Sequence, residues 1–517
     1  MTWLHTWLGV TASLLLFTIF LMGSLSVFDK EIDKWMKPEL RYHLPAGVSL
    51  DERALPKLND LDVMPGGDVW VELPSARYPV IRLSYEEEPN HWHDYLIDPR
   101  TGGEFTITDS WAGTGFFFPF HHMLHMPGGV GRWLVAFLAL SMLTLTLSGI
   151  FVHRHFLRDF FTFRLSPSPH RSFRDLHTVT AVAALPFYLF IGLTGIMIVV
   201  STYFSWSMNL AAGGDSASLD RQFRGTDNFR VEASGTVGHS IESLDEFVAR
   251  AEGLWRAQNA RAPVNAGRIG ILNFNDVNAR VVVAQYFPAQ RVTKGPYIVA
   301  FDSASGEMLG HFEPSTIRQA WNFLEGLHWI QFDNWGLRWL YFFVGLIGTV
   351  MIACGLLFWI EKRLTHMVNG NKPRRGVRFM RALTNGMLAG MLVATCAYLV
   401  LNRVLPDEFT AMEQRRADWE IMGFFPVLWI CIFYATFRGA VAWRDLSWVI
   451  AVLASAAVFL NWITTGHHLV ATVAGGLWSI AAIDLLLLAC SGLAATAAII
   501  LGGRHSASTV MHSAGSS

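Results

Sequence analysis

The sequence predicts a mainly α-helical polytopic membrane protein, with about eight transmembrane helices and two small α+β domains outside the membrane. Of its 517 residues, 52% are hydrophobic and only 16% are charged, whereas a soluble domain carries roughly 25% charged residues. Apolar runs of about 20 residues, which can cross roughly 30 Å of hydrocarbon, recur along the chain. This composition excludes a disordered chain, a coiled coil and an ordinary soluble enzyme. The net charge of −1 provides no basic field that would attract nucleic acid.

Eight apolar runs are long enough to be membrane spans. The first begins at residue 3 without a basic leader or a small-residue cleavage site, so it is expected to be a retained helix. The last is longer than a span requires, which predicts a tilted helix or an exposed end. The expected spans are residues 3–28, 130–152, 178–203, 337–360, 382–404, 419–437, 446–465 and 469–501.

Basic residues in the short loops orient these helices, because Lys and Arg are enriched in cytoplasmic loops. They gather after the second and fourth spans, so both termini are expected in the cytoplasm and the two long polar segments outside. The basic residues on the predicted cytoplasmic side are Arg154, Arg158, Arg164, Arg171, Arg174, Lys362, Arg363, Lys372, Arg374, Arg375, Arg378, Arg381, Arg438, Arg444 and Arg504.

The predicted division of the chain follows from this topology. Two external α+β domains alternate with spans in the first two thirds, and an additional helical bundle follows. The segments are 1–28 (first span), 29–123 (first external domain), 124–203 (second and third spans with a cytoplasmic loop), 204–327 (second external domain), 328–363 (fourth span), 364–503 (four further spans) and 504–517 (cytoplasmic tail).

The first 360 residues contain a repeat. The segment LHTWLGVTASLLLFTIFLMGSL, starting at Leu4, resembles LHTVTAVAALPFYLFIGLTGIM, starting at Leu176. In both, a His and a Gly stand 18 residues apart, which is five helical turns and therefore one helix face. These equivalent pairs are His5 with Gly23 and His177 with Gly195.

The second and fourth spans are also equivalent. LHMPGGVGRWLVAFLALSMLTLTLSGIF starts at Leu124, and LHWIQFDNWGLRWLYFFVGLIGTVMIACGLLF starts at Leu327. Each contains an Arg followed 17 residues later by a Gly, although the distance from His to Arg differs. The equivalent residues are His125 and His328, Arg132 and Arg338, and Gly149 and Gly355.

The external segments match as well. Residues 93–105 and 296–309 each read as a short strand followed by a D-x-x-[ST]-G turn. Residues 243–260 predict an amphipathic helix, and LDERALPKL near residue 50 is a shorter counterpart. Each unit is therefore helix, α+β domain, helix, and the two units are expected to be related by a pseudo-twofold axis along the membrane normal.

Residues 1–363, with their duplicated LH helices and D-x-x-[ST]-G-E turns, resemble the PepSY-associated transmembrane proteins. That family includes dihaem ferric-siderophore reductases of the bacterial inner membrane. The resemblance implies PepSY-like external domains, an inner-membrane location and the reduction of a ferric siderophore. The four C-terminal spans fall outside the pattern.

The repeat pairs four of the 19 histidines. His5 and His177 occupy equivalent cytoplasmic helix ends, while His125 and His328 occupy equivalent outer ends. Haem b held by two histidines needs one imidazole on each side of the macrocycle, and facing bundle helices can supply them. Because the two membrane faces are too far apart for one cofactor, the sequence predicts two non-covalent bis-histidine haems b, one near each face.

Several residues remain alternatives or helpers at these sites. His153 is a fallback ligand at the inner haem, and His121 or His122 could replace His125 at the outer one. Arg132 and Arg338 could pair with haem propionates, although interfacial anchoring explains them equally well. The repeat glycines leave room for a flat macrocycle or for close helix packing.

Two further features are left open by the sequence. His91 and His93 follow three glutamates, a set that suits a borderline metal ion, although an acidic exposed loop is the commoner explanation. Asp484 lies inside the last apolar run, where an ionisable group is costly and usually faces the bundle interior. It could handle protons or cations, or be a hydrogen-bonded structural residue.

Absent motifs narrow the function. The four cysteines lie in apolar stretches without CxxC or CxxCH spacing, which argues against disulfides, zinc ribbons and covalent haem. There is no nucleotide-binding GxGxxG, P-loop or HExxH motif, so electrons are expected from a separate cytoplasmic donor or a membrane quinol.

Three functions are consistent with these features. The first is a transmembrane dihaem oxidoreductase that reduces ferric siderophore at the external face and releases Fe(II). The second is a transporter or permease, but transport sites usually lie near the midplane and the paired histidines do not. The third is a haem-free PepSY binding or regulatory protein in the lipid membrane.

Overall fold

The computed structural model separates into two compact units, and each is described by itself. The helical unit comprises residues 1–41, 108–193 and 340–517, and the sheet unit comprises residues 42–107 and 194–339. The described residues are 1–64, 66–88, 91–127, 129–153, 169–211, 213–214, 225, 227–238, 240–258, 265–285, 292, 297–365 and 375–514. The two basic loops predicted after the second and fourth spans are therefore described only in part, because residues 154–168 and 366–374 lie outside these ranges.

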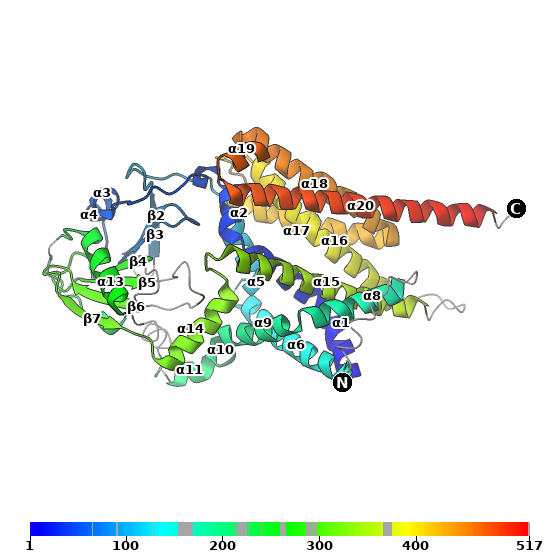
Figure 1. Ribbon diagram of the computed structural model, residues 1–517, viewed down its shortest axis with the longest axis horizontal. Helices are drawn as coiled ribbons and strands as arrows, with labels where there is room; N and C mark the ends of the chain where they lie inside the picture. Colours follow the sequence, from blue (N-terminus) through cyan, green and yellow to red (C-terminus); the bar gives the residue numbers. More distant parts are fainter. Residues whose placement is uncertain are drawn as a thin grey trace. The chain divides into compact units, whose positions relative to one another are not determined.

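The helical unit is built from long apolar helices (Figure 1). Two helices, α9 and α15, extend from it into the sheet unit. The helices that lie wholly or partly in the helical unit are α1 (Thr2–Ser26), α2 (Asp29–Met36), η1 (Pro38–Leu40), α5 (Ala112–Met123), α6 (Val130–Val152), α8 (Pro169–Ala183), α9 (Leu185–Ile198), α15 (Trp335–Thr365), α16 (Arg375–Val404), α17 (Arg416–Arg438), η3 (Gly439–Val441), α18 (Ala442–Thr465), α19 (Leu469–Ala474) and α20 (Trp478–Ala514).

Six helical stretches in the described residues are long and apolar enough to cross a membrane, or seven if the bent pair α8 and α9 is one span. The prediction of a polytopic helical membrane protein is therefore confirmed. One of the six stretches, Arg416–Thr465, is 50 residues long and contains both α17 and α18. A straight helix of that length would extend about 75 Å, yet both of its halves pack against α16, so the chain turns at η3.

Two other spans differ from the sequence prediction for identifiable reasons. The third is bent by 69° between α8 and α9. Pro186 stands at the start of α9 and lacks the amide that would bond to the carbonyl of Val182, which breaks the helix there. The last span begins at Trp478 rather than at 469, because Gly475 and Gly476 separate α19 from α20, and Gly476 has a φ of 69°.

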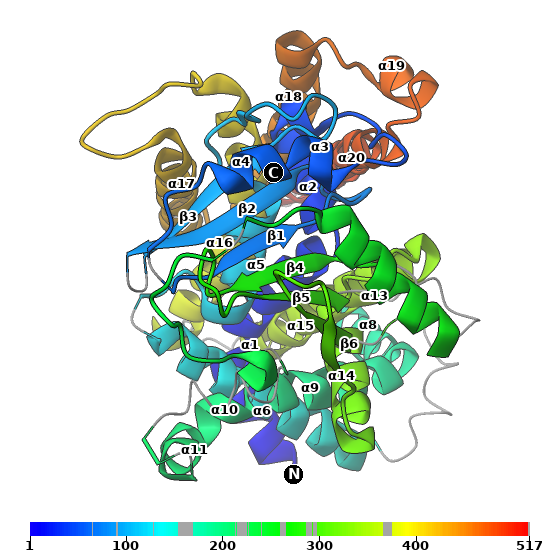
Figure 2. The same ribbon diagram turned by 90° about the vertical axis from the view of Figure 1, so that its left-hand side faces the viewer.

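The sheet unit contains one seven-stranded antiparallel sheet in the order β3-β2-β1-β4-β5-β6-β7 (Figure 2). The strands are β1 (Val69–Glu72), β2 (Ile81–Glu88), β3 (His91–Ile97), β4 (Arg268–Leu272), β5 (Arg280–Gln285), β6 (Tyr297–Asp302) and β7 (Met308–Phe312). Its helices are α3 (Leu50–Arg53), α4 (Leu55–Asn59), α10 (Val200–Tyr203), α11 (Ser205–Ala211), η2 (Asp227–Phe229), α13 (Leu244–Gln258) and α14 (Thr316–Trp329).

The strands of the two segments that the sequence predicts to be external form this sheet jointly, rather than two separate sheets. β1 of the first segment pairs antiparallel with β4 of the second, with Val69 opposite Ile271 and Val71 opposite Ile269. Residues from α3, α4 and α13 pack together with the inward-facing residues of both halves in one buried cluster. The alternation of buried side chains along each strand therefore supplies a single shared core.

The two D-x-x-[ST]-G turns adopt the same structure. Asp98 and Asp302 each accept a backbone hydrogen bond two residues on, from Arg100 at 2.8 Å and from Ala304 at 3.1 Å. The glycines that follow, Gly102 and Gly306, have φ values of 78° and 67°, which L residues rarely adopt. The predicted equivalence of these turns is confirmed.

The two halves also cap one another's helices. Both contain the sequence Ser-Leu-Asp-Glu, at 49–52 and 243–246. Asp51 accepts from the backbone amide of Leu244 at 2.6 Å, at the start of α13, while Asp245 accepts from the amide of Leu50 at 2.9 Å, at the start of α3. The shorter counterpart predicted near residue 50 is thus a true partner of α13.

These reciprocal caps give a first testable prediction. Asp51→Ala should destabilise the start of α13, because loss of a capping carboxylate costs about 1–2 kcal/mol. Hydrogen exchange of the detergent-purified chain should therefore accelerate in residues 244–247, and Asp245→Ala should accelerate exchange in α3 instead. Asp62→Ala, at an exposed aspartate in the same segment, should change neither. Unchanged exchange in α13 of the Asp51 variant would refute the cross-capping.

Asp484 has a structural partner set. Its Oδ1 accepts from the indole of Trp35 in α2 at 2.8 Å and from the amide of Asn461 in α18 at 3.5 Å. Asn461 in turn accepts from the guanidinium of Arg41 at 2.6 Å. This buried network fastens the segment after α1 to the C-terminal helices, which supports the structural interpretation of Asp484.

Candidate functional site

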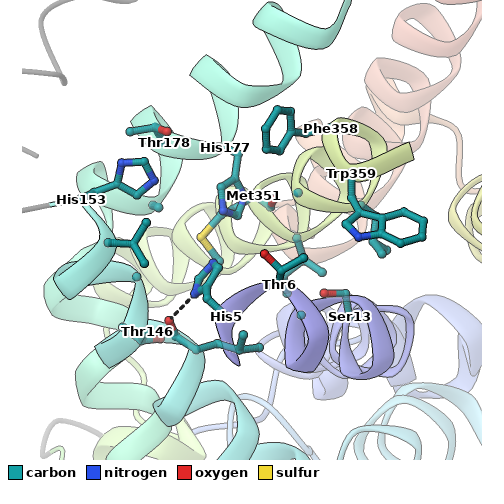
Figure 3. Close-up of a pocket in the computed structure, with 18 of the residues that line it drawn as sticks. His5, Thr6, Ser13, Thr146, His153, His177, Thr178, Met351, Phe358 and Trp359 are labelled. Carbon is teal, nitrogen blue, oxygen red and sulfur yellow. Dashed lines mark hydrogen bonds between the residues drawn. The ribbon is translucent and has the colours of Figure 1, made fainter. Parts of the chain in front are cut away.

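A cavity of about 640 Å³ lies within the helical unit, between α1, α6, α8 and α15 (Figure 3). This volume falls in the usual range of small-molecule and cofactor sites. Its lining is largely apolar and includes Leu16, Phe20 and Tyr188. Polar residues are the minority of the lining. They include His5 and His177, the two histidines at equivalent positions of the first and third predicted spans.

His5 and His177 face one another in this cavity (Figure 3). Their ring centres are 6.5 Å apart, and the ring planes make an angle of 68°. The Nδ1 of His5 lies 3.1 Å from the carbonyl of Leu145 in α6, and the Nδ1 of His177 lies 2.8 Å from the carbonyl of Met351 in α15. Because a carbonyl only accepts, each Nδ1 carries the proton and each Nε2 keeps its lone pair.

Two repeat glycines make room for these rings. A Cβ on Gly149 would lie 3.3 Å from Cε1 of His5, and one on Gly355 would lie 3.0 Å from Cε1 of His177. Each glycine stands four residues after the residue whose carbonyl accepts from the same histidine. A helix turn of the neighbouring helix therefore both orients the imidazole and leaves space for it.

Cationic side chains and a third histidine also line the cavity. Arg174, Lys362 and Arg363 lie among its lining residues, and the Arg363 guanidinium stacks 3.7 Å from the ring centre of Trp359. His153, the fallback ligand, follows the end of α6 and is exposed, although it reaches the same cavity. These groups can pair with carboxylates of a bound molecule.

Another histidine of the helical unit, His121 in α5, has the same kind of environment as His5 and His177. The Nδ1 of His121, in α5, lies 2.9 Å from the carbonyl of Ile19 in α1. A Cβ on Gly23, four residues after Ile19, would lie 2.7 Å from Nδ1 of His121. Burial lowers the pKa of His121, which favours the neutral imidazole.

His125 is placed differently from its expected role. It follows α5 with a φ of 51°, and its Nε2 donates to the carbonyl of Phe116 at 2.8 Å. The ring stacks on Phe116, with 5.0 Å between centres. His122 donates from Nδ1 to the carbonyl of Phe118 in its own helix, at 2.8 Å. Of these three histidines, His121 alone packs against a repeat glycine.

In the sheet unit, His328 lies near the end of α14 beside another repeat glycine. A Cβ on Gly195 would lie 3.0 Å from Cε1 of His328, whose Nδ1 is 3.0 Å from the hydroxyl of Thr194. The two arginines proposed as propionate partners differ, since Arg338 is fully buried with its guanidinium 5.2 Å from the ring centre of Trp335. Arg132, in the helical unit, is exposed.

The four repeat glycines thus each receive one histidine ring, and His121 rather than His125 is the counterpart of His328. A sequence signal for this existed. His121 precedes Arg132 by 11 residues and His328 precedes Arg338 by 10, whereas His125 precedes Arg132 by only 7. The sequence could not predict which carbonyls accept from these histidines, namely those of Leu145, Met351 and Ile19, because every residue has the same backbone carbonyl.

Comparison with known proteins identifies a family for the part of the chain that contains the repeat. The family described as the PepSY-associated TM region matches residues 2–362, which include all four repeat glycines and their histidines. An uncharacterised protein of Pseudomonas aeruginosa is 25% identical over 303 residues, covering 55% of this chain and 71% of that relative. Because the family match spans well over half of the sequence, the chain belongs to the PepSY-associated transmembrane family.

Proposed function

We propose that this protein is a transmembrane dihaem b oxidoreductase that carries electrons from the cytoplasmic side of the bacterial inner membrane to its outer face. There it would reduce a ferric siderophore and release Fe(II). In this proposal the chain spans the membrane eight times, with α17 and α18 counted separately, and both termini lie in the cytoplasm. The electron donor is a separate cytoplasmic reductant or a membrane quinol.

The observation that carries the proposal is the His5–His177 pair. Two imidazoles on opposite sides of one metal ion, each bound at about 2 Å, place their ring centres roughly 6 Å apart. The measured separation is 6.5 Å, and both Nε2 atoms are free of the proton that Nδ1 donates. The residues present therefore fit a bis-histidine haem.

The surrounding residues suit the rest of such a group. Gly149 and Gly355 leave the space beside the two imidazoles that a side chain would fill. Arg174, Lys362 and Arg363 supply positive charge for propionates, and the largely apolar walls suit the macrocycle. Haem bound there would supply one-electron transfer between Fe(III) and Fe(II). The chain's own task is to hold the iron ligands neutral, oriented and shielded.

For the second haem, the sequence repeat pairs His328 with a histidine of the 121–125 group, and we propose His121 as that histidine in place of His125. Each of the two packs against a repeat glycine and has its Nδ1 within hydrogen-bonding distance of an oxygen. Because His125 donates from Nε2 to Phe116, its usual iron-binding nitrogen is already engaged. The assignment rests on this shared environment and on the sequence repeat.

Reduction of the substrate follows from simple coordination chemistry. One electron converts the chelated Fe(III) to Fe(II), a softer ion that hard oxygen donors hold less tightly. No proton transfer by a side chain is required for this step. The proposal therefore needs no acid or base residue at the outer face.

The test is the reduced-minus-oxidised absorption spectrum of the purified full chain. We expect a low-spin b-type signal, two haems per chain in a pyridine haemochrome assay, and reoxidation of the reduced protein on addition of a ferric siderophore. Colourless protein from haem-replete cells would refute the proposal and favour a haem-free binding role. Haem that is not reoxidised by any ferric chelate would refute the substrate class.

Variants test the ligand pair. His177→Ala and Gly355→Val should each remove one haem, the second because its Cβ would displace the His177 ring while leaving the ligand in place. Gly192→Val is the matched control, since a Cβ there meets Met142 only at 3.8 Å. Retention of two haems by both His177→Ala and Gly355→Val would show that the ligand pair lies elsewhere.

A further inference from the structure

A group of metal-binding side chains lies outside the cavity, on the edge of the sheet unit. β3 is an edge strand, and its alternate residues His91, His93, Tyr95 and Ile97 share one face. Ile97 and Tyr95 pack into the core beneath the helices, so this face is the one that α3, α4 and α13 cover. The two histidines continue the same row beyond the core, where they are accessible to solvent.

The neighbouring strand brings a carboxylate to the same place. In the pairing of β2 with β3, Glu86 is opposite Trp92 and Glu88 is opposite His91, so Glu87 is the extra residue of a β-bulge. Bulges redirect a side chain and are frequent at functional edges of sheets. Here the bulge carries the Glu87 carboxylate to the His93 ring.

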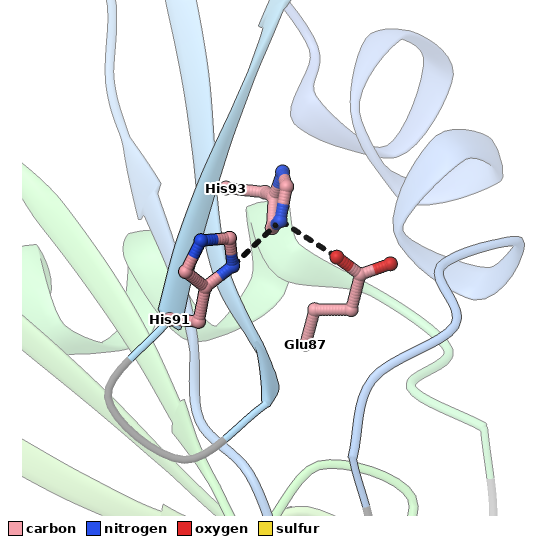
Figure 4. A group of neighbouring side chains, drawn as sticks. All are labelled: Glu87, His91 and His93. Carbon is pink, nitrogen blue, oxygen red and sulfur yellow. Dashed lines mark hydrogen bonds and ion pairs between the residues drawn. The ribbon is translucent and has the colours of Figure 1, made fainter.

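The three ligating atoms converge, as Figure 4 shows. Nε2 of His93 lies 2.6 Å from Oε2 of Glu87 and 3.1 Å from Nδ1 of His91. All three atoms lie within 4.8 Å of one another. A single proton on Nε2 would have to serve both contacts, whereas a cation would satisfy all three lone pairs at once.

We propose that Glu87, His91 and His93 bind a divalent first-row transition-metal ion of the zinc type. Ligands on a tetrahedral ion with bonds of about 2.0–2.2 Å stand roughly 3.3–3.5 Å apart, so these atoms need to move only by small amounts. The two imidazoles are borderline ligands, so together with one hard carboxylate they favour Zn²⁺, Ni²⁺ or Cu²⁺ over Mg²⁺ or Ca²⁺.

The surroundings add to the attraction for a cation and leave room at the metal. Glu86 and Glu88 flank the carboxylate ligand and contribute negative charge. The side chains of Glu87 and His93 are 51% and 41% exposed, so water or an external ligand can complete the coordination sphere. Such an open position is a feature of exchangeable and catalytic metal sites rather than structural ones.

This inference does not depend on the proposed haem chemistry, because no residue is shared between the two sites. Zinc binding and haem content are also measured separately. Failure of one proposal therefore leaves the other intact.

The test is equilibrium dialysis of the untagged full chain against Zn²⁺, with bound metal measured by mass spectrometry after EDTA stripping. We expect the wild type to bind one more equivalent than His91→Ala/His93→Ala. Glu87→Gln should bind that equivalent at least tenfold more weakly, since even outer partners of a metal site are worth about 10–100-fold in affinity. Zn²⁺ should also slow hydrogen exchange in β2 and β3 of the wild type only.

His311→Ala is the matched control, because His311 is an exposed histidine on β7, the opposite edge strand of the same sheet. It should bind as many equivalents as the wild type. Circular dichroism and size-exclusion chromatography of all variants report whether they remain folded. Equal zinc stoichiometry in the wild type and the double variant, or no effect of Zn²⁺ on exchange in the hairpin, would overturn the proposal.

Discussion

His121→Ala is expected to remove one of two haems from the purified chain, while His125→Ala retains both. The imidazole of His121 has its Nδ1 on the carbonyl of Ile19 and lies against Gly23, whereas the Nε2 of His125 donates to Phe116. Removing His121 therefore removes an imidazole that is oriented by a carbonyl and packed against a repeat glycine, whereas removing His125 removes a hydrogen bond to a carbonyl and a stacking contact with Phe116. Pyridine haemochrome stoichiometry distinguishes the two outcomes directly.

A ligand effect must be separated from general unfolding. His122→Ala is a close control, since His122 occupies the next position of α5 and bonds within its own helix. Gly23→Val should reproduce the loss of one haem, because a Cβ there would lie 2.7 Å from the ring of His121. If His125→Ala loses the haem and His121→Ala keeps it, then His125 is the ligand, as the alignment of the LH motifs predicts, and His121 is not.

The sequence predicted the inner pair because His5 and His177 begin equivalent helices, and equivalence alone puts them at one depth. It did not predict which glycine each ring would meet. His5 shares α1 with Gly23 but packs against Gly149 of α6. Which glycine a histidine ring contacts therefore depends on how the helices pack. The spacing of residues along one helix shows which of them share a face, but it does not show which other helix packs against that face.

The alignment of the two LH motifs, on which the His125 prediction depends, differs from the alignment of the helix ends. The LH motif at Leu124 was aligned with that at Leu327, but Leu124 has a left-handed φ of 55° and ends α5. In the second repeat, Ile330 has the equivalent left-handed conformation. If the helix ends rather than the LH pairs are aligned, His328 matches His122, which is one residue from His121 and three from His125.

The shared sheet was also beyond the reach of sequence patterns. The sequence predicted one strand in each segment from the D-x-x-[ST]-G turns at Asp98 and Asp302. The pairing of Val69 with Ile271 joins residues about two hundred positions apart, and no local signal encodes a partner at that distance. The matching Ser-Leu-Asp-Glu segments are the one trace of it, because each aspartate caps the other's helix.

Glu420→Ala is expected to cause a large loss of stability and to release the haem held by His121 first. Glu420 is fully buried in α17 and accepts from Arg416 at 2.8 Å, from Asn402 at 2.7 Å and from Ser110 at 2.6 Å. Removing the carboxylate leaves the Arg416 guanidinium buried without its counter-ion. Breaking such a pair costs about 3–5 kcal/mol.

The expected effect on the haem follows from the contacts that connect Ser110 to α5. Its hydroxyl accepts from the amide of Ala112 at the start of α5, and the hydroxyl of Tyr398 in α16 donates to the carbonyl of Ala112 at 3.0 Å. Phe116 of α5 then stacks on Tyr398, with ring centres 4.2 Å apart. The C-terminal helices thus hold the helix that carries His121, which gives these helices a role although they lie outside the repeat.

Glu420→Gln separates charge from shape, because its amide oxygen can still accept from Asn402 and Arg416 while the negative charge that pairs with Arg416 and the acceptor for Ser110 are lost. We expect it to be intermediate in the temperature of half-unfolding, measured by size-exclusion chromatography after heating. Glu408→Ala, at an exposed glutamate in the preceding loop, should match the wild type. Equal thermal stability and two haems in Glu420→Ala would mean that α5 does not depend on the C-terminal helices. Loss of the His5–His177 haem before the other would place the effect of the network at the opposite end of the helical unit.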